Sequence, residues 1–449
     1  MTGKPEDGEY VDVLLIGGGV AAAAAAEELR RQGFRGSVAL ASRESDPPYH
    51  RFPLTKDYLR GRCAVDDLAV HSPEWWPANG IRLWLRAPVL DLDLTAATAR
   101  IGRRTVRWGQ ALLATGATVR LLDRPGAGLH GVHYLRTTWN ADDLRKELPA
   151  AHDVVVVGGS FVAAETAASI AALGYRTSMV FPEPVPLGRS LGTTVGHIVQ
   201  AELCRLGVDI YGGDGVEALR GDDRVQSVVL TGGEELAADV VVVGIGAKPE
   251  VTLAKRVGLP LGPTGGVHCD ATLRTGHGRI WAAGDVCEFD SVRHGRRVRI
   301  EHDRVAAAQG RHAARAMLGS TALFDDYPYF WTSIGEDLHI DVLALDTPGR
   351  EVMPIDQGAL RNLVSWQQVA GAGPGPRPEA FRFHADGETV GYASINGALS
   401  LPAVRRELTG GPAAAPGNGG AVPENGGAEP ESVVPTLPGE ARPRLRPGR

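Results

Sequence analysis

The chain carries glycines near its N-terminus whose spacing suits nucleotide binding. Gly17 and Gly19 follow the apolar run from Val11 to Ile16, and a run of alanines that includes Ala22 comes next. In the pattern Gly-x-Gly-x-x-Ala the first glycine makes a tight turn, the second admits a pyrophosphate, and the small third residue lets a helix pack on a strand. The N–H groups that open such a helix face the phosphates. We therefore expect a strand, a turn and a helix from Ala21 to Arg30 around a dinucleotide.

The same pattern returns later in the chain in a weaker form. The run from Asp153 to Val157 leads into Gly158, but Ser160 stands where the second glycine would be, and Ala163 takes the third position. The context nevertheless supports a second strand, turn and helix, since a helical stretch follows until Gly174 ends it. Two such units predict two nucleotide sites.

Acidic residues after the second predicted strand of each unit are the expected ribose ligands. Glu44 is the candidate in the first unit, although Arg43 competes for the strand-end position itself. Glu183 is the candidate in the second unit, because a carboxylate there holds both ribose hydroxyls and disfavours a 2′-phosphate. This favours NADH over NADPH, while Arg176 and Arg189 nearby leave NADPH open. An exposed loop acid is the alternative interpretation of Glu183.

Other strand ends complete the candidate sites. The apolar run that starts at Ala111 ends in the small residues Thr115 and Gly116, and Gly246 lies at the exit of the second unit. The segment from Ile280 to Val286 contains the pair Gly284-Asp285. A glycine next to an aspartate suits the close approach of a ribitol or a phosphate, with the carboxylate accepting from a hydroxyl.

Length and composition fit a globular protein of two or three domains. Of the 449 residues, 43% are hydrophobic and 22% are charged, which is ordinary for soluble proteins. A net charge of −6 gives no electrostatic reason to expect nucleic acid or an anionic membrane as a partner. The longest apolar runs are far too short for a bilayer span, and Met1 to Tyr10 lacks the apolar core of a leader. We therefore expect a cytoplasmic protein.

The cysteines and histidines are scattered. The spacing of the four cysteines indicates neither a zinc site nor a redox dithiol, so we expect isolated reduced thiols. The thirteen histidines form no metal-ligand pattern, and no metal is expected. The cysteines are Cys63, Cys204, Cys269 and Cys287.

The remaining segments are assigned by their periodicity. Val225 to Leu230 and Asp239 to Ile245 are predicted to complete the sheet of the second unit. From Tyr327 onward, short alternating segments predict an antiparallel sheet, followed by a helix from Leu401 to Leu408. Residues 410–449 are rich in Gly, Pro, Ala and Glu and are predicted to be a disordered tail.

The segment from Pro48 to Lys56 carries two cations, Arg51 and Lys56, and enough prolines that we expect no helix to begin before Leu54. Taken with both glycine motifs and the two later strand ends, the chain resembles the pyridine-nucleotide-dependent flavoprotein reductases of the glutathione reductase superfamily. It lacks the paired redox cysteines of that superfamily. The proline-rich segment is instead similar to the Pro-Tyr-x-Arg-Pro-Pro-Leu-Ser-Lys loop of ferredoxin reductases and apoptosis-inducing factor.

Further segments are similar to the apoptosis-inducing-factor branch. They are the Gly-Gly-Gly-x-Ala-Ala form of the first turn, Phe181-Pro182-Glu183, the stretch from Gly295 to His302, and Phe330-Trp331-Thr332 with Gly335. The resemblance implies an α/β fold with two Rossmann-like nucleotide-binding domains, one for FAD and one for NAD, and a C-terminal α+β domain with an antiparallel sheet. The expected boundaries are 1–120 and 247–326 for the two parts of the FAD domain, 121–246 for the NAD domain, 327–409 for the C-terminal domain, and 410–449 for the tail.

The resemblance also implies which residues form the site. Lys56 and Glu165 match an ion pair beside the reactive part of the flavin, and with His302 they are the expected catalytic residues. A cation near the ring favours the anionic reduced flavin, and the carboxylate holds that cation in place. The residues expected to bind FAD are Gly17, Gly19, Ala22, Glu44, Arg51, Lys56, Thr115, Gly116, Arg136, Gly284, Asp285, Glu301, His302 and Trp331. Those expected to bind NAD are Gly158, Ser160, Ala163, Glu165, Glu183 and Gly246.

Phe52, Arg43 and Ser160 depart from the family pattern and bear on nucleotide affinity. The favoured interpretation is an FAD-containing NADH oxidoreductase that passes electrons to an acceptor without an enzyme disulfide. The acceptor is left open between a ferredoxin-type iron–sulfur protein, a quinone-like molecule and oxygen. One alternative is a flavoprotein switch in which NADH controls dimerisation or partner binding with slow turnover. Another is a degenerate fold that has lost NADH, suggested by Ser160, and the C-terminal sheet leaves a homodimer open.

Overall fold

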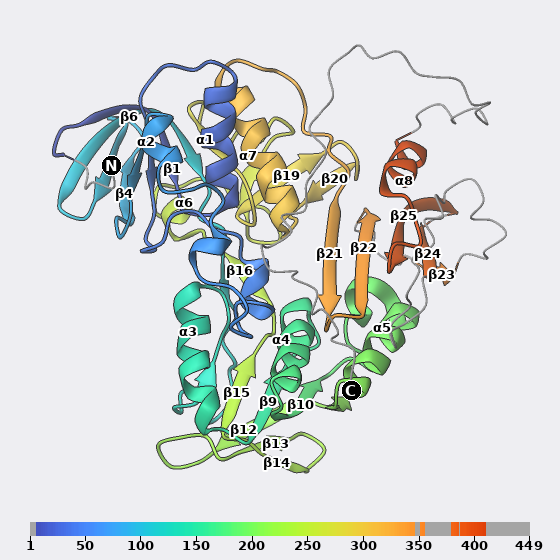
Figure 1. Ribbon diagram of the computed structural model, residues 1–449. Coiled ribbons are helices and arrows are strands. Elements are labelled where there is room, and N and C mark those ends of the chain that lie inside the picture. The colour runs from blue at the N-terminus through green and yellow to red at the C-terminus, as the bar shows by residue number, and fades with distance from the viewer. Residues whose placement is uncertain (1–5, 346–350, 355–378, 386, 410–449) are drawn as a thin grey trace, which may run out of the picture.

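The computed structural model describes residues 6–345, 351–354, 379–385 and 387–409. The tail predicted for residues 410–449 lies outside the described residues. Figure 1 shows two parts built on sheets with helices packed on them, and the strands that come last in the chain standing beside them. None of the described helices combines the length and the hydropathy that crossing a membrane requires.

The first sheet forms around the first glycine motif. Its strands run in the order β3-β2-β1-β6-β5-β4, with β18 paired to the end of β6. The long strand β6 pairs antiparallel with β5 at its start and parallel with β18 at its end, so segments far apart in the sequence share one carboxyl edge. The strands are β1 (Tyr10–Ile16), β2 (Val38–Ala41), β3 (Ile81–Trp84), β4 (Val89–Asp93), β5 (Thr98–Ile101), β6 (Arg104–Leu113) and β18 (Ile280–Ala282).

Helices α1 (Val20–Arg31) and α7 (Asp303–Met317) pack closely against each other on this sheet (Figure 1). Close packing needs small residues, because a Cβ at Gly310 of α7 would lie 2.1 Å from the carbonyl oxygen of Ala21. Helix α1 was predicted within one residue at each end. The contact places the N-terminus of α7, which carries His302, beside the first glycine turn.

A single 3-10 turn, Phe52–Thr55, lies in the proline-rich segment. It begins before Leu54, so the prediction that no helix begins earlier was wrong for this short turn. Pro53 stands near the start of the turn, where the N–H that proline lacks has no partner within the turn. Other short elements are α2 (Trp75–Ala78), a 3-10 turn at Asp66–Leu68 and another at Leu148–Ala150.

The second sheet forms around the second glycine motif, and all of its strands are parallel. Their order is β11-β10-β9-β15-β8. The strands are β8 (Val132–His133), β9 (Asp153–Val157), β10 (Arg176–Phe181), β11 (Val208–Gly212) and β15 (Val240–Val243). The helices of this part are α3 (Thr138–Glu147), α4 (Phe161–Ala172) and α5 (Gly188–Arg205).

One predicted member of this sheet belongs elsewhere. The segment Val225–Leu230 was expected to complete it, but β13 (Ser227–Leu230) pairs antiparallel with β12 (Val216–Arg220) and β14 (Glu235–Ala237) in a separate sheet. A short turn joins β13 to β14. Such a turn can link antiparallel strands, whereas a parallel pair needs a crossover of a dozen or more residues. The other predicted segment, Asp239–Ile245, contains β15 and does join the sheet.

The chain passes between the first and second sheets twice, and the two passages lie side by side. Strands β7 (Ala117–Val119) and β16 (Ala247–Pro249) pair antiparallel there. After the second passage come α6 (Thr252–Arg256) and a small sheet of β17 (Val267–Cys269), β19 (Cys287–Ser291) and β20 (Arg296–Val298). This paired crossing holds the end of β6 next to the end of β15.

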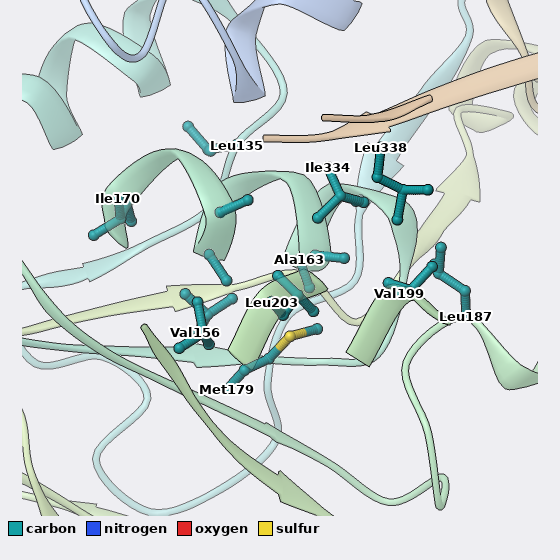
Figure 2. Close-up of a cluster of buried hydrophobic side chains, with 14 of the residues drawn as sticks. Leu135, Val156, Ala163, Ile170, Met179, Leu187, Val199, Leu203, Ile334 and Leu338 are labelled. Atoms are coloured by element: carbon teal, nitrogen blue, oxygen red, sulfur yellow. The ribbon is translucent and has the colours of Figure 1, made fainter. Parts of the chain in front are cut away.

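The last strands form an antiparallel sheet, as predicted, in the order β21-β22-β25-β24-β23. Its elements are β21 (Tyr329–Ile334), β22 (Leu338–Ala344), β23 (Glu351–Pro354), β24 (Glu379–Ala385), β25 (Glu388–Ile395) and the helix α8 (Leu401–Leu408). Figure 2 shows Ile334 and Leu338 close to α4 and α5, in one core with Val156, Val199 and Leu203. The sheet therefore shares a hydrophobic core with the part built on the second sheet.

Ion pairs and close packing contacts also hold the last sheet against α5 and the first part. Gly192 interrupts α5 with φ +81°, and a Cβ there would lie 2.5 Å from a methyl of Val352 on β23. At the turn between β21 and β22, Arg205 of α5 lies 2.5 Å from Asp337, and Arg62 of the first part pairs with Glu336. Strand β21, which carries Phe330, Trp331 and Thr332, is thus held by the parts built on the first and the second sheet.

Candidate functional site

A cavity of about 860 Å³ lies where the three parts of the chain meet. Gly17 and Gly19 of the first turn, Gly244 and Gly246 at the exit of the second unit, and Trp331 of β21 all line it. Its size is in the range of cofactor sites. Of the residues expected to bind nucleotides, Ala22, Gly158, Ala163 and Glu183 do not line this cavity, and all the others do.

The two glycine turns have nearly the same geometry. Gly17 has φ +127° and a Cβ there would lie 2.1 Å from the carbonyl oxygen of Ala114, while Gly158 has φ +125° and a Cβ would lie 2.3 Å from that of Gly244. Only glycine fits such positions. A Cβ on Gly19, in contrast, would meet nothing within 4 Å, because this residue faces the open cavity.

The helices that follow the turns differ at their starts. Gly19 caps α1 without a side chain, and the first turn of α1 has no acidic residue, so its N–H groups and positive dipole end suit an anion. Ser160 caps α4, where its Oγ accepts from Ala163 N–H and donates to the carbonyl of Gly244 at 2.7 Å. The serine in the second motif is therefore a helix cap. The first turn fits the pyrophosphate of a dinucleotide such as FAD without any change of the chain.

Lys56 and Glu165 form a buried ion pair in the wall of the cavity. The Lys56 Nζ lies 2.6 Å from Glu165 Oε1, with side chains only 10% and 9% exposed. The Glu165 carboxylate also accepts from Thr55 Oγ1 at 2.6 Å and from Thr332 Oγ1 at 2.7 Å. The Lys56 ammonium lies 4.7 Å from the centre of the Trp331 ring. Each of the three parts of the chain thus supplies a group to one charged cluster.

Arg51, Glu44 and Tyr49 form a second cluster at the cavity. Arg51 Nη2 lies 2.5 Å from Glu44 Oε1, and the Tyr49 hydroxyl donates to Glu44 Oε2 at 2.7 Å. Burial disfavours the charged carboxylate, but the charge and hydrogen bonds of Arg51 outweigh this and hold the pKa of Glu44 below its usual value. Arg51 also donates to the carbonyl of Arg136 at 2.7 Å. Both oxygens of Glu44 are therefore already engaged.

The carboxyl edge of β18 contributes Gly284 and Asp285. Arg136 Nη2 lies 2.6 Å from Asp285 Oδ2, and the Gly284 N–H donates to the buried Gln309 at 2.8 Å. Glu301 lines the same wall and pairs with Arg299. This wall presents paired rather than isolated charges to the cavity.

His302 caps α7 at the inner end of the cavity. Its Nδ1 accepts from the Arg304 N–H at 3.2 Å, and burial lowers the pKa of His302 to about 4. The ring is therefore neutral near pH 7, and its proton lies on Nε2, since Nδ1 is the acceptor. The rings of Phe330 and His302 are 5.8 Å apart, and Phe161 meets Phe330 edge to face at 5.5 Å.

Glu183 lies beside the second glycine turn. A Cβ on Gly159 would lie 3.2 Å from Glu183 Oε2, and Arg189 Nε lies 2.5 Å from Glu183 Oε1. Arg176 lies at the opposite end of β10 and pairs with Asp153 at 2.5 Å. Of the two arginines that left NADPH open, Arg189 alone is at the predicted ribose position.

Sequence reasoning missed several residues of the site. Thr55 and Thr332 hold Glu165, and Phe161 and Phe330 line the cavity, although all four lie in segments that the motifs had marked. A threonine next to a matched lysine gives no signal of its partner in sequence. Glu250, which also lines the cavity, was not predicted at all.

The four cysteines are free thiols, and Cys269 and Cys287 neighbour each other rather than being isolated. Burial raises the pKa of the Cys63 thiol to about 11. Among the described residues no cluster of three or more His, Cys, Asp or Glu could hold a metal ion.

Comparison with known proteins adds to this geometry. The family model described as pyridine nucleotide-disulphide oxidoreductase matches residues 11–310, which include both glycine turns. Rhodocoxin reductase of Rhodococcus erythropolis is 32% identical over 324 residues, 72% of this chain and 75% of that protein. Rubredoxin-NAD(+) reductase of Pseudomonas putida is 31% identical over 325 residues, 72% of this chain and 84% of that protein. The crystal structure of the ferredoxin reductase for the CYP199A2 system of Rhodopseudomonas palustris has a TM-score of 0.78 and 29% identity, covering 86% of this chain and 91% of that one.

Proposed function

The chain belongs to the pyridine nucleotide-disulphide oxidoreductase family, in the branch of ferredoxin reductases and apoptosis-inducing factor, and on that premise we propose that it carries electrons from NADH to an iron–sulfur protein. It is an FAD-dependent NAD(P)H oxidoreductase. The observation that carries the proposal is the buried Lys56–Glu165 pair in a cavity that reaches the first glycine turn and the start of α4 at Ser160.

FAD fits the cavity through the first turn, where the open space at Gly19 and the uncapped start of α1 suit its pyrophosphate. We propose Arg51, Thr115, Gly116, Arg136, Gly284 and Asp285 as the residues along its length. When bound, FAD supplies a ring that accepts a hydride from the nicotinamide and releases electrons to an acceptor.

Lys56 places a positive charge at the cavity wall where negative charge develops on reduction. Its position is set by Glu165, which is itself fixed by the hydroxyls of Thr55 and Thr332. A charge held in advance in a site with little water stabilises the developing charge without reorganisation. The rings of Phe161 and Trp331 help to exclude that water.

His302 has a role that does not require it to change charge. Its pKa of about 4 keeps the ring neutral, so Nε2–H is a donor at every pH from about 5 upward. We propose that it positions a group in the cavity by this hydrogen bond. No general base is required, because positioning supplies most of the rate of a hydride transfer.

Glu183 supports NADH as the donor. A carboxylate beside the second turn accepts from the ribose hydroxyls and repels a 2′-phosphate. Arg189 pairs with Glu183 and moderates this repulsion, so we propose a preference rather than an exclusion of NADPH.

An iron–sulfur protein is the proposed acceptor because the names of the relatives pair such reductases with rubredoxin and ferredoxin. The four free cysteines are consistent with the reducing cytoplasm, where we place the protein. A homodimer through the C-terminal sheet stays a prediction.

Stopped-flow reoxidation tests the acceptor. Protein reduced with NADH is mixed with a [2Fe–2S] ferredoxin, with a soluble quinone and with oxygen at equal concentrations. We expect the ferredoxin to reoxidise the flavin fastest. Faster reoxidation by quinone or oxygen would contradict the acceptor class. Slow reoxidation by all three, with an NADH-dependent change in size on gel filtration, would favour the redox switch instead.

A further inference from the structure

The first nucleotide-binding unit lacks an acid where the second unit has one. Strand β10 ends at Phe181, and Glu183 follows it by two positions. Strand β2 ends at Ala41, and the residue two positions later is Arg43. The two turns share their geometry at Gly17 and Gly158, so the strand ends are comparable positions. A ribose in the first unit would meet a guanidinium where a ribose in the second meets a carboxylate.

Glu44 does not fill this gap. Both of its oxygens are engaged by Arg51 and Tyr49, at 2.5 and 2.7 Å. Turning either oxygen toward a ribose would break a hydrogen bond to a charged or buried partner. A carboxylate for the ribose must therefore come from elsewhere in the cavity.

Glu250 supplies a carboxylate at the right place. It follows β16 directly and lines the cavity together with Arg43. Its backbone is tied to the end of the β6 loop, since its N–H donates to the Gly116 carbonyl at 2.9 Å and its carbonyl accepts from Thr115 Oγ1 at 2.7 Å. Its side chain points toward Arg43, with Glu250 Oε2 at 3.7 Å from Arg43 Nη1.

The Glu250 carboxylate keeps acceptor capacity for a ligand, because a carboxylate has about four acceptor sites and the hydrogen bonds of Glu250 come from Thr252. Oε1 accepts from the Thr252 N–H at 3.1 Å, at the start of the short helix α6. The charged neighbour of Oε2 is the Arg43 guanidinium, 3.7 Å away, whose side chain is 54% exposed. Burial works against the charged form of Glu250, but the hydrogen bonds from Thr252 and the charge of Arg43 outweigh it, and the pKa of Glu250 lies below its usual value. The group is thus an anion with spare acceptor capacity.

We propose that Glu250 accepts from the hydroxyls of the adenosine ribose of FAD, and that Arg43 is a positioning residue that holds the Glu250 carboxylate over the cavity. In this chain the acid of the first unit thus follows β16 rather than β2. This inference rests on FAD being the occupant of the first turn. The competing interpretation is that Glu250 serves only to cap α6, which uses Oε1 alone.

The test measures FAD affinity of the full-length protein after FAD has been removed and added back. We expect Glu250→Gln to weaken FAD binding roughly 10- to 100-fold, the value of one or two hydrogen bonds to a charged acceptor. Glutamine keeps a carbonyl for the Thr252 N–H, so the cap survives. Glu217→Gln, on the exposed face of β12 and outside the cavity, is the matched control and should bind FAD as the wild type does.

Two further measurements separate ribose binding from capping. An FAD analogue without the adenosine 2′- and 3′-hydroxyls should bind weakly to the wild type, with no additional loss in Glu250→Gln. The double variant R43E/E250Q returns an acid to the end of β2 and should regain most of the FAD affinity. FMN, which has no adenosine, should bind to the wild type and to Glu250→Gln with equal affinity.

The proposal is overturned if Glu250→Gln binds FAD as tightly as the wild type, or if the analogue loses the same factor in both proteins. Either result would leave Glu250 as a cap of α6. Neither depends on NADH, so failure of this proposal is distinct from failure of the proposed reductase function, which is tested by whether NADH reduces the bound flavin.

Discussion

Lys56 Nζ lies 2.6 Å from Glu165 Oε1, and this contact joins the two nucleotide-binding parts of the chain. Thr332 of the C-terminal sheet donates to the same carboxylate oxygen at 2.7 Å. Lys56 follows the 3-10 turn of the first part, Glu165 lies in α4, and Thr332 lies in β21. The charged cluster can form only when all three parts are assembled, so the position of the Lys56 charge depends on the complete fold.

Neutralising Glu165 should slow the reaction and destabilise the protein. Glu165→Gln leaves the buried Lys56 ammonium without its counter-charge, which typically costs about 3–5 kcal/mol of stability. We expect NADH-dependent flavin reduction, followed by stopped-flow absorbance, to fall roughly tenfold or more. The double variant Lys56→Met/Glu165→Gln should recover stability in thermal unfolding but not the reduction rate. Full rate in the double variant would contradict a role for the charge.

Removing the Thr332 hydroxyl should act through Glu165. Thr332→Val deletes one hydrogen bond to a charged acceptor and should lower the unfolding free energy by about 1.5–3 kcal/mol. Thr332→Ser keeps the hydroxyl and is the matched control. Urea unfolding of both variants measures the difference. Unchanged stability of Thr332→Val, or a larger loss in Thr332→Ser than in Thr332→Val, would contradict a role for the hydroxyl.

Alanine substitutions at the two glycines of the first turn should have different effects, one on folding and the other on FAD binding. Gly17→Ala places a Cβ 2.1 Å from the Ala114 carbonyl at φ +127°, so we expect a loss of more than about 2 kcal/mol or no folding. Gly19→Ala meets nothing within 4 Å and has φ −95°, so the apoprotein should keep its stability within about 0.5 kcal/mol. Its methyl would nevertheless enter the space assigned to the pyrophosphate. FAD titration of a stable Gly19→Ala apoprotein should show at least roughly tenfold weaker binding.

Glu183 and Arg189 should set the choice of nucleotide. Glu183→Gln removes the charge that repels a 2′-phosphate, so the ratio of kcat/KM for NADH to that for NADPH should fall about tenfold. Arg189→Gln should change the ratio in the other direction, since it frees Glu183 from its partner. Steady-state rates with both nucleotides check this. An unchanged ratio in Glu183→Gln would place the ribose elsewhere.

His302 should make the protein less stable in acid. Its ordinary pKa of 6.5 is lowered to about 4 by burial, so the unfolded chain binds a proton at this residue before the folded chain does. Stability is therefore lost as the pH falls from 6.5 toward 4, by on the order of 2–3 kcal/mol from this group. His302→Asn keeps a cap for α7 but cannot titrate, and it should lose less stability over that range. Unfolding at several pH values compares the two proteins, and identical slopes would contradict the buried neutral ring.

The sequence predicted the parts of the site that local patterns encode. Glycine turns such as Gly17 and Gly158 could be predicted because backbone geometry there excludes other residues. The placement of β13 could not, because apolar strands look alike whether they join a parallel sheet or a hairpin. Thr332 lies in a family-like segment, but its contact with Glu165 could not be predicted, because the two residues are distant in sequence. Glu250 carries no local signal. The engagement of Glu44 by Arg51 and Tyr49 likewise depends on how the proline-rich segment folds back on β2.

The most direct measurement of the central claim is an anaerobic titration of the purified protein with NADH, followed by the visible absorption of its flavin. The account predicts that stoichiometric NADH bleaches the flavin of the wild type and produces a new long-wavelength band, and that Glu165→Gln requires much longer to reach the same end point. A protein that holds no flavin, or a bound flavin that NADH leaves oxidised, would contradict the account.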